Sequence, residues 1–208
     1  MKTSFQPVSV AFQDVTAMRG DKTLFSGLSL TLSSAQLIWV QGTNGVGKTT
    51  LLRLAAGLSP PAAGTITRHS AGSPCSAQAI TIYQGHSNAL KRQLSVSEEL
   101  EFWANIYSFS GAINDILIRV GLAQQAELKC GVLSAGQGRR LAIARLLVSG
   151  KPLWIMDEPA AAMDEVGQAL IAEVIETHLG NGGAVLAASH DTLKRFKGPT
   201  SVLRLEAV

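Results

Sequence analysis

The fold is decided by one stretch, Gly42-Thr43-Asn44-Gly45-Val46-Gly47-Lys48-Thr49, which matches the phosphate-binding pattern G-x-x-x-x-G-K-S/T. Its glycines let the backbone curl so that successive N–H groups point at phosphate oxygens. Lys48 adds a positive charge for the β- and γ-phosphates, and the Thr49 hydroxyl is suited to hold Mg²⁺. An apolar strand at residues 36–41 precedes the loop and a helix at 49–56 follows it, as the motif requires. We therefore expect residues 42–49, together with Thr50, to bind ATP with Mg²⁺.

A second apolar strand, at residues 152–156, ends in two carboxylates, Asp157 and Glu158. Asp157 is placed to hold Mg²⁺, directly or through water, as phosphate-loop ATPases require. Glu158 is then the natural base, or positioning group, for the attacking water. An acidic pair after an apolar run is often just a strand end at the surface. The phosphate-binding loop in the same chain favours the catalytic interpretation.

A third motif, Leu133-Ser134-Ala135-Gly136-Gln137, directly precedes a predicted helix at residues 139–148. A small turn of this kind presents free N–H groups and the Ser134 hydroxyl to an anion. An ordinary helix cap would explain Ser134, but it would not explain Gly136 and Gln137 as well. With this motif the chain resembles the ABC ATPase family, whose signature is LSGGQ. The resemblance implies that Ser134, Gly136 and Gln137 close over the nucleotide of a second copy, so that two head-to-tail subunits form two composite sites.

Two more segments fall in the order that the ABC family shows. Residues 161–164 resemble the family's D-loop, with Asp164 at its acidic position. Residues 187–191 end a strand and resemble the segment that carries the switch histidine. The resemblance implies that His190 contacts the γ-phosphate and helps position water near Glu158. A lone histidine at a strand end is usually structural or solvated, but its place after Asp157 favours the catalytic role.

Two positions depart from the usual ABC pattern. His86 stands where most members carry the glutamine of the Q-loop; its imidazole is a candidate ligand to the metal or to catalytic water, and it is titratable. Arg19 stands at the position that is usually aromatic and stacks on adenine. A planar guanidinium is also able to stack on a base, so we expect Arg19 to contact the nucleotide.

Sequence segments around these motifs resemble one branch of the family, the haem-exporter ATP-binding subunits of cytochrome c biogenesis. Residues 83–91 are similar to that branch's Y-L-G-H-x-x-G-I/L-K segment, in which a histidine at position 86 is expected. Residues 133–140 and 152–159 are similar as well, although Gly138, Ala160 and Ala161 depart from its usual wording. The resemblance implies a peripheral ATPase on the cytoplasmic face of a bacterial inner membrane. Its partners would be integral-membrane permease subunits, and its task haem delivery.

Strand and helix signals alternate along the chain, which indicates an α/β fold with a mainly parallel core sheet. Residues 28–32 alternate with period two and predict an antiparallel N-terminal part. Between residues 88 and 148 the pattern turns helical, which predicts a helical sub-domain inserted into one domain, 1–208. The core then comprises residues 1–87 and 149–208. Further strands are predicted at 80–83, 184–189 and 201–205, and further helices at 112–120 and 165–179. The capping-box sequence at 95–98 opens another helix.

Composition excludes several other classes of protein. Hydrophobic residues make up 46% of the 208 residues and charged residues 16%, which is typical of a globular chain. No stretch approaches the roughly 18 to 20 apolar residues of a membrane span, and we find no secretory signal. Cys75 and Cys130 have no metal-ligand spacing. A net charge of +3 is too small to indicate nucleic-acid binding, and basic pairs such as Arg139-Arg140 are expected on a solvated face.

Two other functions remain open on the sequence alone. The nucleotide motifs fit an ABC exporter for a lipid, a peptide or a drug equally well, and only the branch-specific wording favours haem. A soluble ABC protein acting on DNA or the ribosome is the other alternative. DNA-repair relatives carry a long coiled coil and translation factors carry two ATPase domains, and neither feature is found in this sequence.

Overall fold

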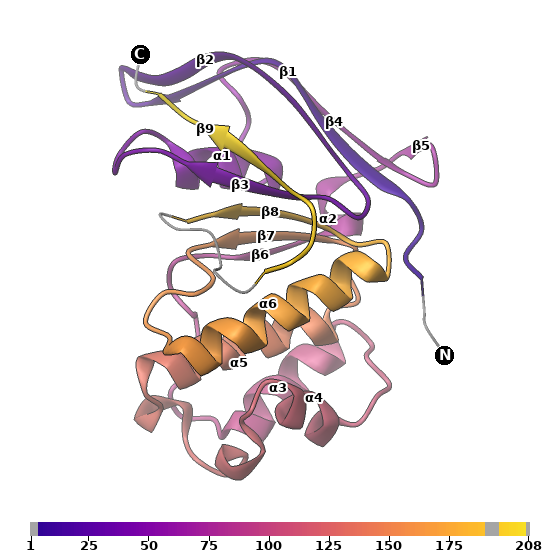
Figure 1. Cartoon of the computed structure of the whole chain (residues 1–208), viewed down its shortest axis with the longest axis vertical. Helices are drawn as coiled ribbons and strands as arrows, with labels where there is room; N and C mark the ends of the chain where they lie inside the picture. The colour runs from indigo at the N-terminus through magenta and orange to yellow at the C-terminus, as the bar shows by residue number, and fades with distance from the viewer. Residues whose placement is uncertain (1–3, 190–195, 207–208) are drawn as a thin grey trace.

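The chain folds into two stacked sheets with helices between them and below them (Figure 1). The structure is a computed structural model that describes residues 4–189 and 196–206. Helix α1 (Lys48–Ala55) lies between the two sheets, while α5 (Ala135–Val148) and α6 (Glu165–Gly180) cover the other face of the second sheet (Figure 1). This layered arrangement confirms the predicted α/β class.

The first sheet is antiparallel and has the strand order β2-β1-β4-β5. Its strands are β1 (Val8–Arg19), β2 (Lys22–Ser33), β4 (Ala63–Ser70) and β5 (Ser73–Pro74). The prediction for residues 28–32 is confirmed as part of β2, which is much longer. Strand β1 escaped prediction because its register with β2 shifts after Phe12, so its apolar residues do not keep one period.

The second sheet is entirely parallel and has the strand order β6-β7-β8-β3-β9. Its strands are β3 (Leu37–Gln41), β6 (Thr81–Gln84), β7 (Leu153–Asp157), β8 (Ala184–Ala188) and β9 (Thr200–Arg204). Alternate residues of β7 face opposite cores: Leu153 and Ile155 pack toward α1, whereas Trp154 and Met156 pack toward α5 and α6. Burial on both faces explains why these strands are nearly continuous apolar runs.

The helical block contains α3 (Val96–Ile106) and α4 (Ile113–Arg119), which pack with α5 around a hydrophobic cluster of their own. Ser95 and Glu98 form the predicted capping box at the start of α3. Residue 80 differs from the prediction, because it ends the short helix α2 (Ala77–Ile80) and β6 begins one residue later. In the described part of the chain, no helix has the length and apolar character that crossing a membrane demands.

His178 is a buried titratable group in the core below the parallel sheet. Its ring stacks on Trp154 with the centroids 3.7 Å apart, and Nε2 lies 3.0 Å from the Pro152 carbonyl oxygen. Burial lowers the pKa of His178 to about 4, although hydrogen bonds to Pro152 and Ala184 act in the opposite direction. The folded chain therefore binds this proton less readily than the unfolded chain.

We expect His178 to make the protein sensitive to acid. Its contribution to stability is complete above the unfolded pKa of about 6.5 and is lost as the pH falls toward 4, by roughly 3 kcal/mol in total. His178→Gln should flatten this part of the pH dependence, because the amide stays neutral and still offers a donor to Pro152. Urea unfolding at pH 7 and pH 4.5 measures the difference. His69→Gln, on β4, is the control and should keep the wild-type difference; equal pH dependence in both variants would contradict the prediction.

Candidate functional site

The candidate site is a cavity of about 540 Å³ at the carboxyl edge of the parallel sheet. The phosphate-binding loop follows β3, His86 lies two residues beyond β6, and Asp157 ends β7. The carboxyl ends of parallel strands meet at one edge, which is where ligands bind in α/β sheets. The fold thus collects three separate sequence motifs at one place. The lining residues are Arg19, Leu24, Asn44, Gly45, Gly47, Lys48, Thr49, Thr50, His86, Asp157, Glu158 and Ala161.

The glycines of the loop at 42–49 are required by its backbone conformation and by close packing. Gly42 has a φ of 148°, and a Cβ there would lie 2.6 Å from the Leu205 carbonyl oxygen. Gly47 has a φ of 113° and packs against the Leu24 and Phe25 side chains. Val46 is buried in the core between them and anchors the loop. These contacts hold the loop in a tight turn at the start of α1, and a helix N-terminus is a favourable site for phosphate.

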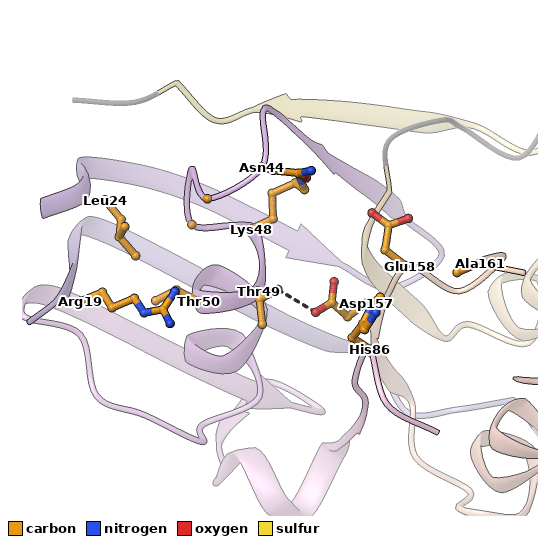
Figure 2. Close-up of a pocket in the computed structure, with 12 residues that line it drawn as sticks. Arg19, Leu24, Asn44, Lys48, Thr49, Thr50, His86, Asp157, Glu158 and Ala161 are labelled. Carbon is orange, nitrogen blue, oxygen red and sulfur yellow. Dashed lines mark hydrogen bonds between the residues drawn. The ribbon is translucent and has the colours of Figure 1, made fainter. Parts of the chain in front are cut away.

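Lys48 and Thr49 place a cation and a hydroxyl at the start of α1. The Lys48 side chain is 9% exposed, and its Nζ donates to the carbonyl oxygens of Gly42 at 2.7 Å and Thr43 at 3.3 Å. The Thr49 hydroxyl donates to Asp157 Oδ2 at 2.8 Å (Figure 2). The amine and the hydroxyl therefore come from adjacent residues, but the amine contacts the loop at 42–43 and the hydroxyl contacts Asp157 at the end of β7.

Asp157 and Glu158 differ in burial and in backbone conformation. Asp157 is 4% exposed, and its carboxylate points at Thr49 (Figure 2). Glu158 lies in the left-handed region with a φ of 50°, which a side-chain-bearing residue adopts rarely. Its Oε2 accepts a hydrogen bond from the Ser189 hydroxyl at 3.4 Å. The adjacent carboxylates thus have different partners, Thr49 for Asp157 and Ser189 for Glu158, while both residues line the cavity.

The donor set suits a magnesium ion that is held mainly by a bound phosphate and water. The Thr49 hydroxyl and the Asp157 carboxylate supply the hard oxygen ligands that Mg²⁺ prefers. Across residues 4–189 and 196–206 there is no cluster of three or more His, Cys, Asp or Glu side chains that could hold a metal by themselves. Mg²⁺ usually takes only one or two protein ligands when it accompanies a nucleotide.

Both unusual positions of the sequence line the cavity. In Figure 2, His86 is drawn at the same end of the cavity as Asp157, and Arg19 extends toward Thr50 at the opposite end. His86 and Arg19 are exposed, so either side chain is accessible to a bound nucleotide. The predicted switch residue, His190, lies outside the described residues. Its neighbour Ser189, the last described residue of this segment, donates a hydrogen bond to Glu158.

The signature motif has a different structure from the predicted turn. Helix α5 begins at Ala135 rather than near residue 139, so the motif forms its cap and first turn. Ser134 and Gln137 make a reciprocal capping box, which stabilises this start despite Gly138. None of the described residues that line the cavity belongs to the signature. Within one chain, Ser134, Gly136 and Gln137 therefore lie outside this cavity.

Arg139 is a residue at this site whose position sequence reasoning missed. The pair Arg139-Arg140 is predicted on a solvated face. In the structure Arg139 is 2% exposed, and only Arg140 is partly exposed to solvent. Burial lowers the pKa of the Arg139 guanidinium, while the nearby carboxylates of Asp157 and Glu158 act in the opposite direction. A basic pair in sequence does not show which member turns inward. The helical phase gives no signal either, because all residues from Leu141 to Val148 except Leu147 are buried, so α5 has no single buried face.

Comparisons with known proteins agree with this geometry. The sequence profile of the ABC transporter family matches residues 25–161. A protein of Rhizobium johnstonii named "Cytochrome c biogenesis ATP-binding export protein CcmA" is 42% identical over 186 residues, which cover 86% of each chain. A protein of the same name from Rhodopseudomonas palustris is 45% identical over 181 residues, covering 85% of this chain and 88% of its own.

Solved structures show the same fold at lower identity. A putative ABC transporter ATP-binding protein from Pyrococcus furiosus superposes with a TM-score of 0.81 at 24% identity, covering 95% of this chain and 97% of its own. A bacterial ABC transporter cassette that was solved as a dimer gives a TM-score of 0.78 at 22% identity, covering 94% of both chains. The predicted ABC ATPase fold is thereby confirmed. On the profile match and these identities, the chain belongs to the ABC transporter family.

Proposed function

We propose that this chain is the ATP-hydrolysing subunit of an ABC exporter, that it uses Mg²⁺ with ATP, and that the exporter serves cytochrome c biogenesis. One observation carries the proposal: the Thr49 hydroxyl and the Asp157 carboxylate lie 2.8 Å apart in a cavity that Lys48 and Glu158 also line. This constellation holds the phosphates, offers oxygen ligands to a metal and keeps a carboxylate beside the space where water would attack. Family membership supports each of these roles.

The residues divide the hydrolysis step among them. The loop N–H groups and Lys48 bind the phosphate oxygens, and the positive charge stabilises the negative charge that builds up as the γ-phosphoryl group is transferred. Thr49 and Asp157 would hold Mg²⁺, which neutralises charge on the β- and γ-phosphates. Glu158 accepts a proton from the water whose oxygen attacks the γ-phosphorus, while the bond to the ADP oxygen breaks. His86 and His190 would orient this water, and Arg19 would stack on the adenine.

A second copy of the chain would complete the site. The signature lies outside the pocket of its own chain, so an inserted helical sub-domain at 88–148 would present it to the nucleotide of the partner. Two strongly exposed apolar side chains support an interface there: Val132, which is 69% exposed and precedes the signature, and Val166, which is 74% exposed and follows Asp164. Burying such side chains between subunits is favourable. We infer a head-to-tail dimer.

The role in cytochrome c biogenesis rests on the relatives and on His86. The proteins named CcmA, at 42% and 45% identity, are export proteins of cytochrome c biogenesis by name. The sequence around His86 follows the same branch of the family rather than the glutamine pattern. We infer that the chain works as a peripheral subunit on the cytoplasmic face of a bacterial inner membrane. There it would drive haem delivery through integral-membrane permease subunits.

A groove beside the nucleotide pocket supports docking of such permease subunits. It has a volume of about 540 Å³ and runs between β6 and α3, lined among others by Leu58, Tyr83, Trp103, Tyr107 and Arg145. Its walls are mostly aromatic and apolar, with the Arg145 guanidinium 4.9 Å from the Trp103 ring. His86 lines both this groove and the nucleotide pocket. A segment bound in the groove would therefore contact the loop that also contacts the nucleotide.

Co-purification from the native membrane tests the proposal. We expect integral-membrane subunits of a cytochrome c maturation system to accompany the wild-type chain. Leu58→Glu should lose them while it keeps ATPase activity in isolation, because Leu58 is 52% exposed and lines the groove rather than the nucleotide pocket. Val202→Glu, at a 47% exposed position on β9 at the other edge of the sheet, is the matched control and should keep them. Recovery of an unrelated permease would contradict the haem role.

A further inference from the structure

Arg139 makes an unusual set of contacts beneath the nucleotide site. Its Nη2 donates to the carbonyl oxygens of Asp157 at 2.9 Å and Glu158 at 2.6 Å. Its Nη1 donates to the carbonyl oxygens of Gly85 at 3.0 Å and His86 at 3.3 Å, and to the Asn88 side-chain oxygen at 2.9 Å. One guanidinium on α5 thus contacts both the segment after β7 and the segment after β6. Nearly all of its acceptors are backbone carbonyls.

The contacts to the segment after β7 surround a strained residue. Glu158 has a φ of 50° without being glycine, a conformation that needs support from its surroundings. Its N–H donates to the Ala188 carbonyl at 2.9 Å, and its carbonyl accepts from Ala161 at 3.1 Å as well as from Arg139. Arg139 therefore holds the carbonyls on both sides of Glu158. Fixing these two peptide planes fixes the direction in which the Cα–Cβ bond leaves the backbone.

We propose that Arg139 is a positioning residue for hydrolysis: it holds Glu158 in its left-handed conformation, so that the carboxylate faces the water-attack position, and it ties this conformation to the His86 loop. The inference rests on the proposed function of Glu158 as base. Arg139 itself lies beneath the site and is not among the residues that line the nucleotide pocket. Its effect should therefore fall on turnover rather than on nucleotide affinity.

The local packing around Arg139 supports a specific arrangement. Gly138 precedes it, and a Cβ at that position would lie 3.1 Å from the Asn88 side-chain nitrogen. Because residue 138 has no side chain, the Asn88 side chain lies close to α5, where its oxygen accepts a hydrogen bond from Arg139. Arg139 is 2% exposed and makes five donor–acceptor contacts. They are costly to lose, because the buried Asp157 carbonyl would remain without this donor.

Steady-state kinetics on three variants test the proposal. Arg139→Gln should lower kcat at least 10-fold and leave KM for ATP within about threefold, since Arg139 holds Glu158 and the His86 loop but makes no hydrogen bond to the phosphate-binding loop at 42–49. Arg139→Lys keeps a cation that reaches some of the same carbonyls, so it should recover part of kcat. Arg68→Gln is the matched control, because Arg68 also donates to backbone carbonyls, those of Leu54 and Ala55, but at the far end of α1. It should keep the wild-type kcat even if it unfolds at a lower temperature.

A second measurement separates positioning from general destabilisation. The Glu158→Gln chain should form an ATP-bound dimer, and the double variant Arg139→Gln/Glu158→Gln should form it too, because nucleotide binding and the signature are intact. Arg139→Gln with unchanged kcat, or a double variant that no longer forms the dimer, would overturn the proposal. If the wild-type chain has no ATPase activity, or if Glu158→Gln alone forms no ATP-bound dimer, the proposed function itself is contradicted.

Discussion

Glu158→Gln should stop ATP turnover while it leaves ATP binding intact. The amide has nearly the shape of the carboxylate but does not accept the proton of the attacking water, so kcat should fall at least about 100-fold. The phosphate contacts of the loop at 42–49 and of Lys48 do not involve Glu158. The bound ATP should therefore persist and hold two copies together. Phosphate release measures turnover, and size-exclusion chromatography with ATP measures the dimer.

Glu101→Gln is a suitable control for this experiment, because Glu101 is an exposed carboxylate on α3 outside the nucleotide pocket. It should retain wild-type turnover and show no trapped dimer. Retained turnover in Glu158→Gln would show that another residue is the base, and His190 would then be the first residue to examine.

Lys48→Ala should weaken nucleotide binding itself. Lys48 is 9% exposed at the start of α1, and its amine contacts the loop that would hold the β- and γ-phosphates. Losing two charge-assisted contacts of about 1.5 kcal/mol each corresponds to a roughly 100-fold increase in Kd. Fluorescent ATP-analogue titration measures the change, and turnover should be lost at ATP concentrations that saturate the wild-type chain.

Lys151→Ala provides the comparison for this variant. Lys151 also donates to two backbone carbonyls, those of Gln78 and Ala79, but it is outside the pocket. Nucleotide affinity should be unchanged in it. An Lys48→Ala chain that binds ATP as tightly as wild type would show that the loop N–H groups alone hold the phosphates.

Much of the parallel core could be predicted because its strands are buried on both faces. Residues 36–41 and 152–156 are apolar runs for this reason, and the structure has them as β3 and β7. The antiparallel sheet was mostly missed. Strand β4 has no buried residue, and β1 changes register along its length, so neither keeps the alternation that a strand prediction needs.

The candidate site was predictable wherever a local pattern carries the chemistry. The loop at 42–49, the Asp157-Glu158 pair and His86 were all chosen from short motifs, and the structure brings them to one cavity. Arg139 was not predictable in this way, because its acceptors come from two segments that are distant in sequence. The backbone conformation of Ala89 was not predictable either. Its φ of 51° favours glycine, which the similar branch of the family carries there, but only the structure shows this φ.

In the proposed dimer, each nucleotide is held by the loop of one copy and the signature of the other. Mixing two inactive variants tests it most directly. Lys48→Ala removes the phosphate contact of a chain, and Ser134→Arg blocks its signature. A mixed head-to-tail dimer retains one site with an intact loop and an intact signature. We predict that ATPase activity, absent from either variant alone, returns when the two are mixed. Activity that stays absent in a verified mixed dimer would show that the signature of one copy does not complete the site of the other.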